Sequence, residues 1–406
     1  MISFVLGIVS TKIVSVFLGP SGMVLLGSFR NFSTMLKSVS TLGISTSVVA
    51  LFVENKDDKD ALSAIYSTYL WIFLGIAIVL GTSVFFLADT LSQLLFFTNR
   101  YTFPIRFFAI LLPLIILNTF WLAVYNGLQK FKTIIIIQVI SSILIFCATT
   151  FLIVRNQMFG GLLAIAFAEL LLFVISYLFV RKDKILNFNI LYKIDLKHFH
   201  IIGKFSLMAL LSAVLGPTVL IAIRNLIVGE FNVEVAGIWD AVNRFSGFYM
   251  MFFSSGLSLY YMPKLAALKS DSEFKVEIIS YFKTLVPLFL AVMIFLFIFR
   301  NFIIDVAFTN TFSQIKSIMI WQLAGDFFRV MTLAFGFQIL VKTMVWKYAL
   351  IEVVFNLAYL ILSAVLMKSL AVEGVVIAYF YSCVLSFLIV LWMFRSLFSS
   401  KANDDI

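Results

Sequence analysis

Long apolar blocks follow one another along almost the whole chain, and short polar stretches separate them. Each block is long enough to cross a bilayer as a helix, which needs about 20 mainly apolar residues. The blocks are solid rather than alternating, which excludes a transmembrane β-barrel. We predict twelve membrane-spanning helices, at residues 1–18, 23–53, 61–87, 103–127, 132–154, 160–181, 204–228, 234–262, 276–300, 314–341, 343–367 and 373–397.

The composition agrees with this pattern. Hydrophobic residues make up 62% of the 406-residue chain and charged residues 12%, against roughly 25% charged residues in soluble proteins. The predicted class is therefore an all-α polytopic membrane protein. The connections between the blocks are short, so we expect the protein to act within the membrane, with no nucleic acid as partner.

The distribution of Lys and Arg orients the predicted helices, because cytoplasmic loops carry an excess of these residues. With the amino terminus inside, seventeen of them fall in inside segments and six in outside segments. We therefore expect both termini to be cytoplasmic. The loop at 182–203 is the richest in cations and is expected to lie along the anionic lipids of the inner leaflet.

The two halves of the chain are related to each other. When the stretch 30–45 is aligned with the stretch 243–258, the Phe-Ser and Gly-x-Ser of the first fall on the Phe-Ser and Gly-x-Ser of the second. Six helices separate the two stretches, which is the arrangement of a parallel repeat. We predict two pseudo-symmetric six-helix bundles around a central cavity, at residues 1–181 and 204–406, joined by a linker at 182–203.

Eleven charged side chains remain inside the predicted spans. Each costs about 2.5–3.5 kcal/mol on insertion scales and is expected to face a cavity or a partner. Helical spacing predicts two local ion pairs, Asp240 with Arg244 and Asp326 with Arg329. The other two acids have no cation at such a spacing, so each needs a partner helix, a cavity or a proton. The seven cations are Lys12, Arg30, Lys37, Arg224, Arg244, Lys283 and Arg329, and the four acids are Glu169, Asp240, Asp326 and Glu352.

Four cations without a local acid are expected to line a cavity. Arg30 and Lys37 are two helical turns apart, so they share one helix face with neighbouring hydroxyls such as Ser33. Lys12 lies in the preceding predicted helix, and Arg224 lies in its counterpart in the second half. Excess positive charge selects an anion, and a guanidinium matches phosphate oxygens. We predict a cargo that carries phosphate and is rich in hydroxyls, and we expect the serines and threonines to meet its sugar or phosphate oxygens.

Several stretches resemble the Wzx-type lipid-linked oligosaccharide flippases of the multidrug/oligosaccharidyl-lipid/polysaccharide exporter superfamily. They occur in the family's order and span the whole chain. These stretches are FLGPSGMVLLGSFRNF (17–32), KFSLMALL (204–211), GIWDAVNRFS (237–246), YYMPKLAAL (260–268) and WQLAGDFFRVMTLAFGFQILVKTMVWKYALIEV (321–353). Family members usually have more residues before the first helix, so this helix is expected to be short and tilted, or the start of the chain to be assigned late.

The resemblance implies a twelve-helix inner-membrane protein of bacteria that moves a polyprenyl-diphosphate-linked oligosaccharide, such as an O-antigen unit, to the periplasmic leaflet. A glycan polymerase and a chain-length regulator become candidate partners. Coupling to protons or Na⁺ is suspected for the group, and the sequence does not choose among the four acids as ion site. No other cofactor and no metal site are expected. On matching positions the substrate and coupling residues are Arg30, Lys204, Arg224, Lys342, Asp326 and Glu352, whereas Lys12, Lys37, Asp240 and Glu169 rest on the charge analysis.

Two other classes of function compete with this interpretation. A multidrug exporter of the same superfamily would favour an acidic, aromatic cavity, and the net charge of +3 inside the predicted spans argues against it. An enzyme acting on the same lipid, such as a polymerase or ligase, needs a sizeable outer loop with catalytic residues. The outer loops at 88–102 and 301–313 are short and contain no histidine, so we predict a protein that is not an enzyme.

Overall fold

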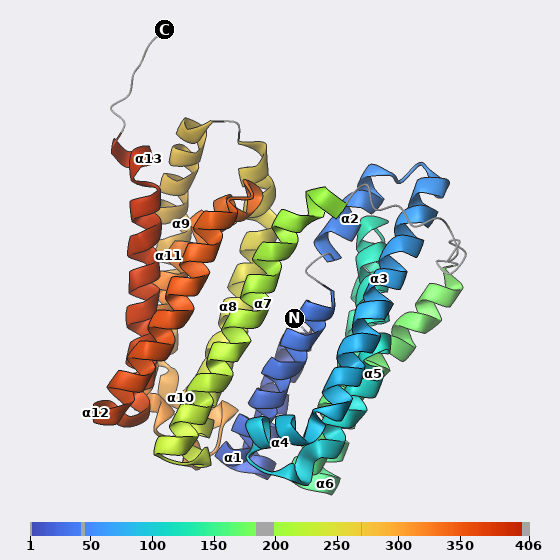
Figure 1. Cartoon of the computed structure of the whole chain (residues 1–406). Coiled ribbons are helices and arrows are strands. Elements are labelled where there is room, and N and C mark those ends of the chain that lie inside the picture. The colour runs from blue at the N-terminus through green and yellow to red at the C-terminus, as the bar shows by residue number, and fades with distance from the viewer. Residues whose placement is uncertain (1, 42–44, 184–198, 269, 400–406) are drawn as a thin grey trace. The chain divides into compact units, whose positions relative to one another are not determined.

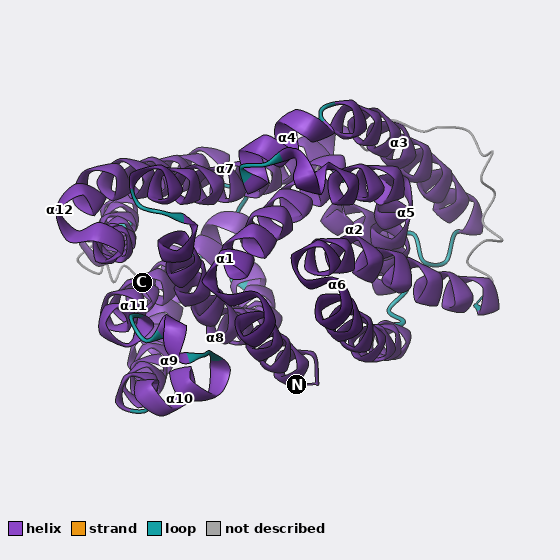
Figure 2. Ribbon diagram, turned by 90° about the horizontal axis from the view of Figure 1, so that it is seen from below, coloured by secondary structure: helices purple, strands orange, loops and turns teal. Residues whose placement is uncertain are grey.

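The computed structural model describes residues 2–41, 45–183, 199–268 and 270–399. Every regular element in these ranges is a helix (Figures 1 and 2). Eight of the described helices are long and apolar enough to cross a membrane. The predicted class of all-α multi-pass membrane protein is therefore confirmed, whereas the count of twelve spans stays a prediction.

The chain divides into two compact units, Met1–Pro217 and Thr218–Ile406. The boundary falls inside α7 (Phe199–Glu230), at its internal proline. Most of the predicted linker at 182–203 lies outside the described residues, so the predicted domain bounds stay a prediction. Before α7, unit 1 contains α1 (Ile2–Ser40), α2 (Ser45–Glu54), α3 (Lys59–Phe86), α4 (Ala88–Phe96), η1 (Asn99–Tyr101), α5 (Thr102–Gly127) and α6 (Phe131–Lys182). After α7, unit 2 contains α8 (Val233–Ala267), α9 (Asp271–Ile298), α10 (Arg300–Ala307), η3 (Asn310–Phe312), α11 (Ile315–Val341), α12 (Val345–Met393) and α13 (Arg395–Ser399).

Three of these helices contain a residue with non-helical backbone angles, and each such residue lies in a predicted gap between spans. The residues are Gly19 in α1 (φ 62°), Gln157 in α6 (φ 48°) and Ala371 in α12 (φ 50°). At the first break, glycine tolerates the positive φ, and Pro20 then begins the next helical stretch without an unsatisfied N–H.

Glycines allow α6 and α12 to turn back on themselves. A Cβ on Gly160 would lie 1.9 Å from the carbonyl oxygen of Leu152, and one on Gly374 would lie 2.4 Å from that of Leu366. Eight residues span about 12 Å along a straight helix, so these close approaches require the chain to reverse between them. Each long element is therefore a helical hairpin, closed at a point where any side chain would collide with backbone.

The elements of the two units repeat in the same order with a nearly constant offset along the chain. The matching helix starts are Lys59 and Asp271 for α3 and α9, Ala88 and Arg300 for α4 and α10, Thr102 and Ile315 for α5 and α11, and Phe131 and Val345 for α6 and α12. The side chains of Asp58 and Ser270 cap α3 and α9, and Gln157 and Ala371 mark equivalent breaks. The structure therefore supports the internal repeat that the sequence predicts.

Equivalent helices form the core of each unit. In unit 1, α5 packs against α2, α3 and α6, and α1 packs against α6. In unit 2, α11 packs against α8, α9 and α12. Small residues permit close approach, as expected for helix packing in membranes: a Cβ on Gly81 of α3 would lie 2.8 Å from the carbonyl oxygen of Ala109 in α5. These contacts hold the charged residues of α1, α6, α8 and α11 at fixed positions.

Candidate functional site

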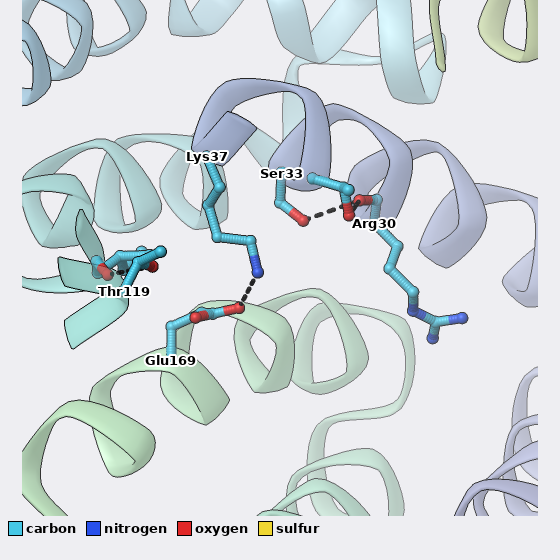
Figure 3. Close-up of polar contacts among 7 residues, drawn as sticks. Arg30, Ser33, Lys37, Thr119 and Glu169 are labelled. Carbon is cyan, nitrogen blue, oxygen red and sulfur yellow. Dashed lines mark hydrogen bonds and ion pairs between the residues drawn. The ribbon is translucent and has the colours of Figure 1, made fainter. Parts of the chain in front are cut away.

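Unit 1 contains an ion pair inside its helical packing. Lys37, near the end of α1, donates from Nζ to Oε1 of Glu169 in the second half of α6, at 2.6 Å (Figure 3). The two side chains are 30% and 17% exposed. The sequence predicted Lys37 as a cavity cation and Glu169 as an acid in need of a partner, and the structure brings the two together from distant parts of the chain.

The packing of α1 against α6 sets the geometry of this pair. Gly161 follows the break in α6, and a Cβ there would lie 3.2 Å from the side chains of Leu18 and Leu26. The glycine therefore lets the two halves of α1 approach the second half of α6. Glu169 lies two helical turns further along α6, where it faces Lys37.

Arg30 lies two helical turns before Lys37 on the same helix and is half-buried. Figure 3 shows both side chains leaving α1 on the same side, as the spacing predicts, with the guanidinium of Arg30 directed away from Glu169. Lys12 lies before the break at Gly19 and is also half-buried. Three of the predicted cations thus occur on α1, and Lys37 pairs with a carboxylate of α6.

The hydroxyls around Arg30 bond to their own helix. Ser33 and Thr34 each donate to the carbonyl oxygen of Arg30 at 2.9 Å, and Thr41 donates to those of Lys37 and Ser38. A hydroxyl has one proton to donate and two lone pairs. In this arrangement these side chains have lone pairs but no spare proton, and of the three only Thr34 is exposed.

Unit 2 contains a more deeply buried ion pair. Arg224 of α7 has no exposed surface and donates from Nη2 to Oδ1 of Asp240 in α8 at 2.5 Å. Its guanidinium lies 5.7 Å from the ring centre of Trp239. Among the described residues, Nε and Nη1 of Arg224 have no hydrogen-bond partner. Helical spacing predicted that Asp240 pairs with Arg244, and the structure shows that Arg224, from another helix, also pairs with this carboxylate.

A second carboxylate of unit 2 lies at the centre of a hydroxyl cluster. Asp326 of α11 is fully buried and accepts from Ser246 and Tyr379 at 2.6 Å each, from Gln322 at 3.4 Å, and from the hydroxyl of Tyr249. Gly325 makes room for this arrangement, since a Cβ there would lie 2.7 Å from two ring carbons of Tyr379. Four donors from three helices therefore hold the carboxylate in place.

The predicted ion pair between Asp326 and Arg329 is indirect. Arg329 donates to the hydroxyl of Tyr379 at 3.3 Å, and that hydroxyl donates to Asp326. The guanidinium lies 5.9 Å from the ring centre of Phe355. The sequence did not point to Tyr249 or Tyr379, because an aromatic residue within an apolar block gives no signal until its neighbours are known.

The remaining predicted residues lie apart from these clusters. Glu352 of α12 is half-buried, and within the described residues it accepts from the side chain of Asn356 at 3.4 Å. Lys342 is exposed just after α11 and donates to the carbonyl oxygen of Leu268 at 3.0 Å. Lys204 belongs to α7, and its side chain lies outside the described residues. Among the described residues no three His, Cys, Asp or Glu side chains could together hold a metal ion.

Residues 13–317 match the model of a protein family described as polysaccharide biosynthesis protein. The match covers about three quarters of the chain. This chain belongs to that family.

Relatives of this polysaccharide biosynthesis protein carry a more specific name. The chain is 25% identical over 348 residues to the lipid III flippase of Escherichia coli (strain K12), which covers 86% of this chain and 84% of the relative. The lipid III flippase of Shigella flexneri matches with the same identity and coverage. The expected resemblance to oligosaccharide-lipid flippases is thereby confirmed.

Solved structures with similar folds come from both branches of the exporter superfamily. An inward-facing multidrug resistance MATE family transporter of the MOP superfamily aligns with a TM-score of 0.70 at 14% identity, over 98% of this chain and 96% of its own. The lipid II flippase MurJ in an inward closed conformation aligns with a TM-score of 0.68 at 17% identity, over 97% and 86%. At these identities the likeness shows the fold of this chain and does not decide its cargo.

Proposed function

We propose that this protein is a flippase that moves a polyprenyl-diphosphate-linked oligosaccharide from the cytoplasmic to the periplasmic leaflet by alternating access. The observation that carries the proposal is the similarity to lipid III flippases over 86% of the chain. The family and the fold agree with it. The excess of Lys and Arg in the predicted inside loops supports a bacterial inner-membrane protein with both termini cytoplasmic, and the proposal needs no enzymatic step.

Among the six predicted substrate cations, the geometry within each unit, taken separately, favours Arg30 and Lys37 of unit 1 and Arg224 of unit 2 as candidate ligands of the diphosphate. Arg30 and Lys37 leave the same face of α1, two turns apart, so one extended anion can reach both. Arg224 has two donor nitrogens without a hydrogen-bond partner among the described residues, and a phosphate oxygen would satisfy them once a conformational change uncovers this fully buried side chain. Lys342 is a weaker candidate because its ammonium already caps a backbone carbonyl. Lys12 and Lys204 remain in the proposal on their sequence positions.

Binding at Lys37 would be an exchange of anions. Glu169 neutralises this cation in the structure, so a phosphate must displace the carboxylate or bind beside it. A displaced Glu169 would be left partly buried without its cation and would need another partner.

The four acids differ in their suitability for coupling to protons or Na⁺. Asp326 is held in place by four hydrogen bonds. Asp240 is held by Arg224. Within the described residues Glu352 has no cationic partner and accepts from one amide, so we propose Glu352 as the main ion site beside Glu169. A glycan polymerase and a chain-length regulator are proposed as partners that use the translocated lipid.

The test is translocation by single variants. Arg30→Ala and Arg224→Ala are to be expressed in cells that lack their own lipid III flippase, with surface glycan and membrane protein level as readouts. We expect glycan display to be lost in both variants, with an unchanged protein level in Arg30→Ala and a lowered one in Arg224→Ala, because Asp240 loses its cation there. Lys56→Ala, in the exposed turn before α3, should behave as the unchanged protein. Normal glycan display in both Arg variants would overturn the proposed anion site.

The second candidate is a multidrug exporter, favoured by the fold shared with MATE transporters. Purified protein in vesicles would then extrude cationic dyes against a proton or Na⁺ gradient. We expect no dye efflux, because the charge inside the predicted spans is net positive. Dye efflux without glycan translocation would replace the flippase proposal.

A further inference from the structure

A pocket of about 570 Å³ lies in unit 2 and is lined by residues from both ends of α12 and from α13. It is distinct from the ion pairs and hydroxyl cluster described above. Its size falls in the range of sites for small molecules, about 300–1,000 Å³. The lining residues come from the start of α12, from its end and from α13, and include Trp346, Lys347, Leu350, Trp392, Arg395 and Ser396.

Two tryptophans place this pocket at the membrane surface. Trp346 is 85% exposed and Trp392 is 61% exposed, although both lie at the ends of apolar helical stretches. Exposed tryptophans at helix ends are typical of the headgroup level of a bilayer, where the ring is half in the hydrocarbon. The predicted orientation puts this end of α12 on the cytoplasmic side.

The pocket also presents two cations whose charge no described carboxylate neutralises. Lys347 lies with its ammonium 4.6 Å from the ring centre of Phe394, and Arg395 lies with its guanidinium 5.5 Å from that of Trp392. Neither forms an ion pair with an acid within the described part of the chain. Aromatic faces hold both charges in position without cancelling them.

We infer that this pocket binds the headgroup of an anionic phospholipid of the surrounding leaflet. The phosphate lies between Lys347 and Arg395, and the hydroxyl of Ser396 donates to it. The glycerol and the first acyl carbons lie against Leu350 and the two tryptophan rings. Anionic lipids attract basic residues at this depth, whereas a zwitterionic headgroup brings no net charge to compensate the two cations.

The internal repeat shows that the fold does not require this pocket. When the breaks at Gln157 and Ala371 are aligned, Trp346 falls on Lys132 and Trp392 falls on Leu178. Unit 1 forms the equivalent hairpin α6 without either tryptophan. The aromatic pair is therefore an addition of unit 2 and is not needed to close the hairpin. This inference does not depend on the proposed flippase activity.

The test compares lipid binding by native mass spectrometry on the full chain, delipidated in detergent and titrated with phosphatidylglycerol or phosphatidylcholine. We expect phosphatidylglycerol to bind in preference, and the double variant Lys347→Gln/Arg395→Gln to weaken its binding by about thirtyfold. The matched control is Lys56→Gln/Lys59→Gln, which removes the same charge from an exposed turn of unit 1 and should leave binding unchanged. Melting temperature in detergent checks that each variant is folded.

Three results would overturn the inference. Equal binding of phosphatidylglycerol and phosphatidylcholine would show that the pocket does not discriminate by headgroup charge. An equal loss of binding in the control variant would show a general surface effect. Binding of undecaprenyl diphosphate but not phosphatidylglycerol, lost in the Lys347/Arg395 variant, would make the pocket part of the substrate path instead. Lys347→Arg keeps the charge and should retain binding of phosphatidylglycerol. If Trp346→Leu binds this lipid as tightly as the unchanged chain, the proposed contact with the tryptophan is refuted.

Discussion

The ion pair between Lys37 and Glu169 offers a test in which stability and transport separate. The repeat supplies the substitutions, because aligning the two halves places Met250 at the position of Lys37 and Cys383 at the position of Glu169. Unit 2 therefore forms the same helix arrangement with two uncharged residues at these positions. The perturbation is Lys37→Met alone, and then Lys37→Met/Glu169→Cys.

The structure sets the size of the effect. The two groups meet at 2.6 Å, with side chains 30% and 17% exposed. Fully exposed pairs contribute about 0–1 kcal/mol, and removing one partner of a buried pair costs about 3–5 kcal/mol. For this half-buried pair we expect Lys37→Met to lower the free energy of unfolding by about 2 kcal/mol. The double variant should regain most of this loss, because no charge is left without a partner.

Two measurements distinguish a structural from a functional role. Thermal unfolding in detergent gives the relative stability, and glycan display in cells without their own flippase gives transport. We expect Lys37→Met to lower both stability and transport. The double variant should regain stability but not transport, because one cation proposed to bind the diphosphate is still missing. Lys316→Met is the control because its partner Asp305 is 55% exposed, against 17% for Glu169, and it should change stability by less than about 1 kcal/mol.

Transport restored in the double variant would show that Lys37 serves only to neutralise Glu169. A loss below about 0.5 kcal/mol in Lys37→Met would refute the electrostatic reasoning itself, since an exposed pair gives as little.

Three further predictions concern unit 2. Gly374→Ala should lower the free energy of unfolding by about 1–3 kcal/mol, and with it the melting temperature, because the new Cβ would meet the carbonyl of Leu366. Gly336→Ala is the control: a Cβ there has nothing within 4 Å and should be neutral or slightly stabilising, and equal effects of the two variants would contradict the hairpin geometry. Asp326→Asn should cost about 1–3 kcal/mol in detergent unfolding, because an amide offers one acceptor where four donors converge; a cost no larger than that of the exposed Asp305→Asn would count against the cluster. Glu352→Gln should leave the melting temperature unchanged and abolish the dependence of flipping on a proton or Na⁺ gradient, and a retained dependence would place coupling at another acid.

The apolar pattern predicted the fold well because helix length is imposed by the bilayer. The gaps at 18–23, 154–160 and 367–373 each contain a residue with positive φ in the structure. The predicted helix at 23–53 was less accurate, since α1 ends at Ser40 and α2 begins at Ser45. The short helices α4 and α10 lie in stretches predicted as loops, because eight or nine residues are too few to give a periodic signal.

The charged pairs were predicted less well, for a physical reason. Spacing along one helix proposed partners for Asp240 and Asp326, whereas the structure places a residue of another helix on each, Arg224 on Asp240 and Tyr379 on Asp326. A pair on one helix surface contributes about 0.2–0.5 kcal/mol, whereas an uncompensated buried charge costs several kcal/mol. The fully buried Arg224 therefore gains more from pairing with Asp240 than a residue on the surface of the same helix would. This pairing becomes visible only when the positions of α7 and α8 in space are known.

The hydroxyls of α1 change the interpretation of the cavity cations. The sequence suggested that Ser33, Thr34 and Thr41 could meet either sugar or phosphate oxygens. Contact with a phosphate oxygen requires that these hydroxyls donate. In the structure each of them donates its proton to a backbone carbonyl, so each has only lone pairs to offer. A phosphate oxygen is itself an acceptor and gains nothing from them.

Recognition of the proposed cargo then divides by chemistry. In the proposed function the diphosphate is bound by cations such as Arg30 and Lys37, because these side chains carry donors with charge. The hydroxyl groups of the glycan are donors, and they match the acceptors along α1, of which Thr34 is the exposed one. Changes of cargo among related flippases would then arise from the hydroxyl positions, while the cations stay fixed by the phosphate chemistry common to all of them.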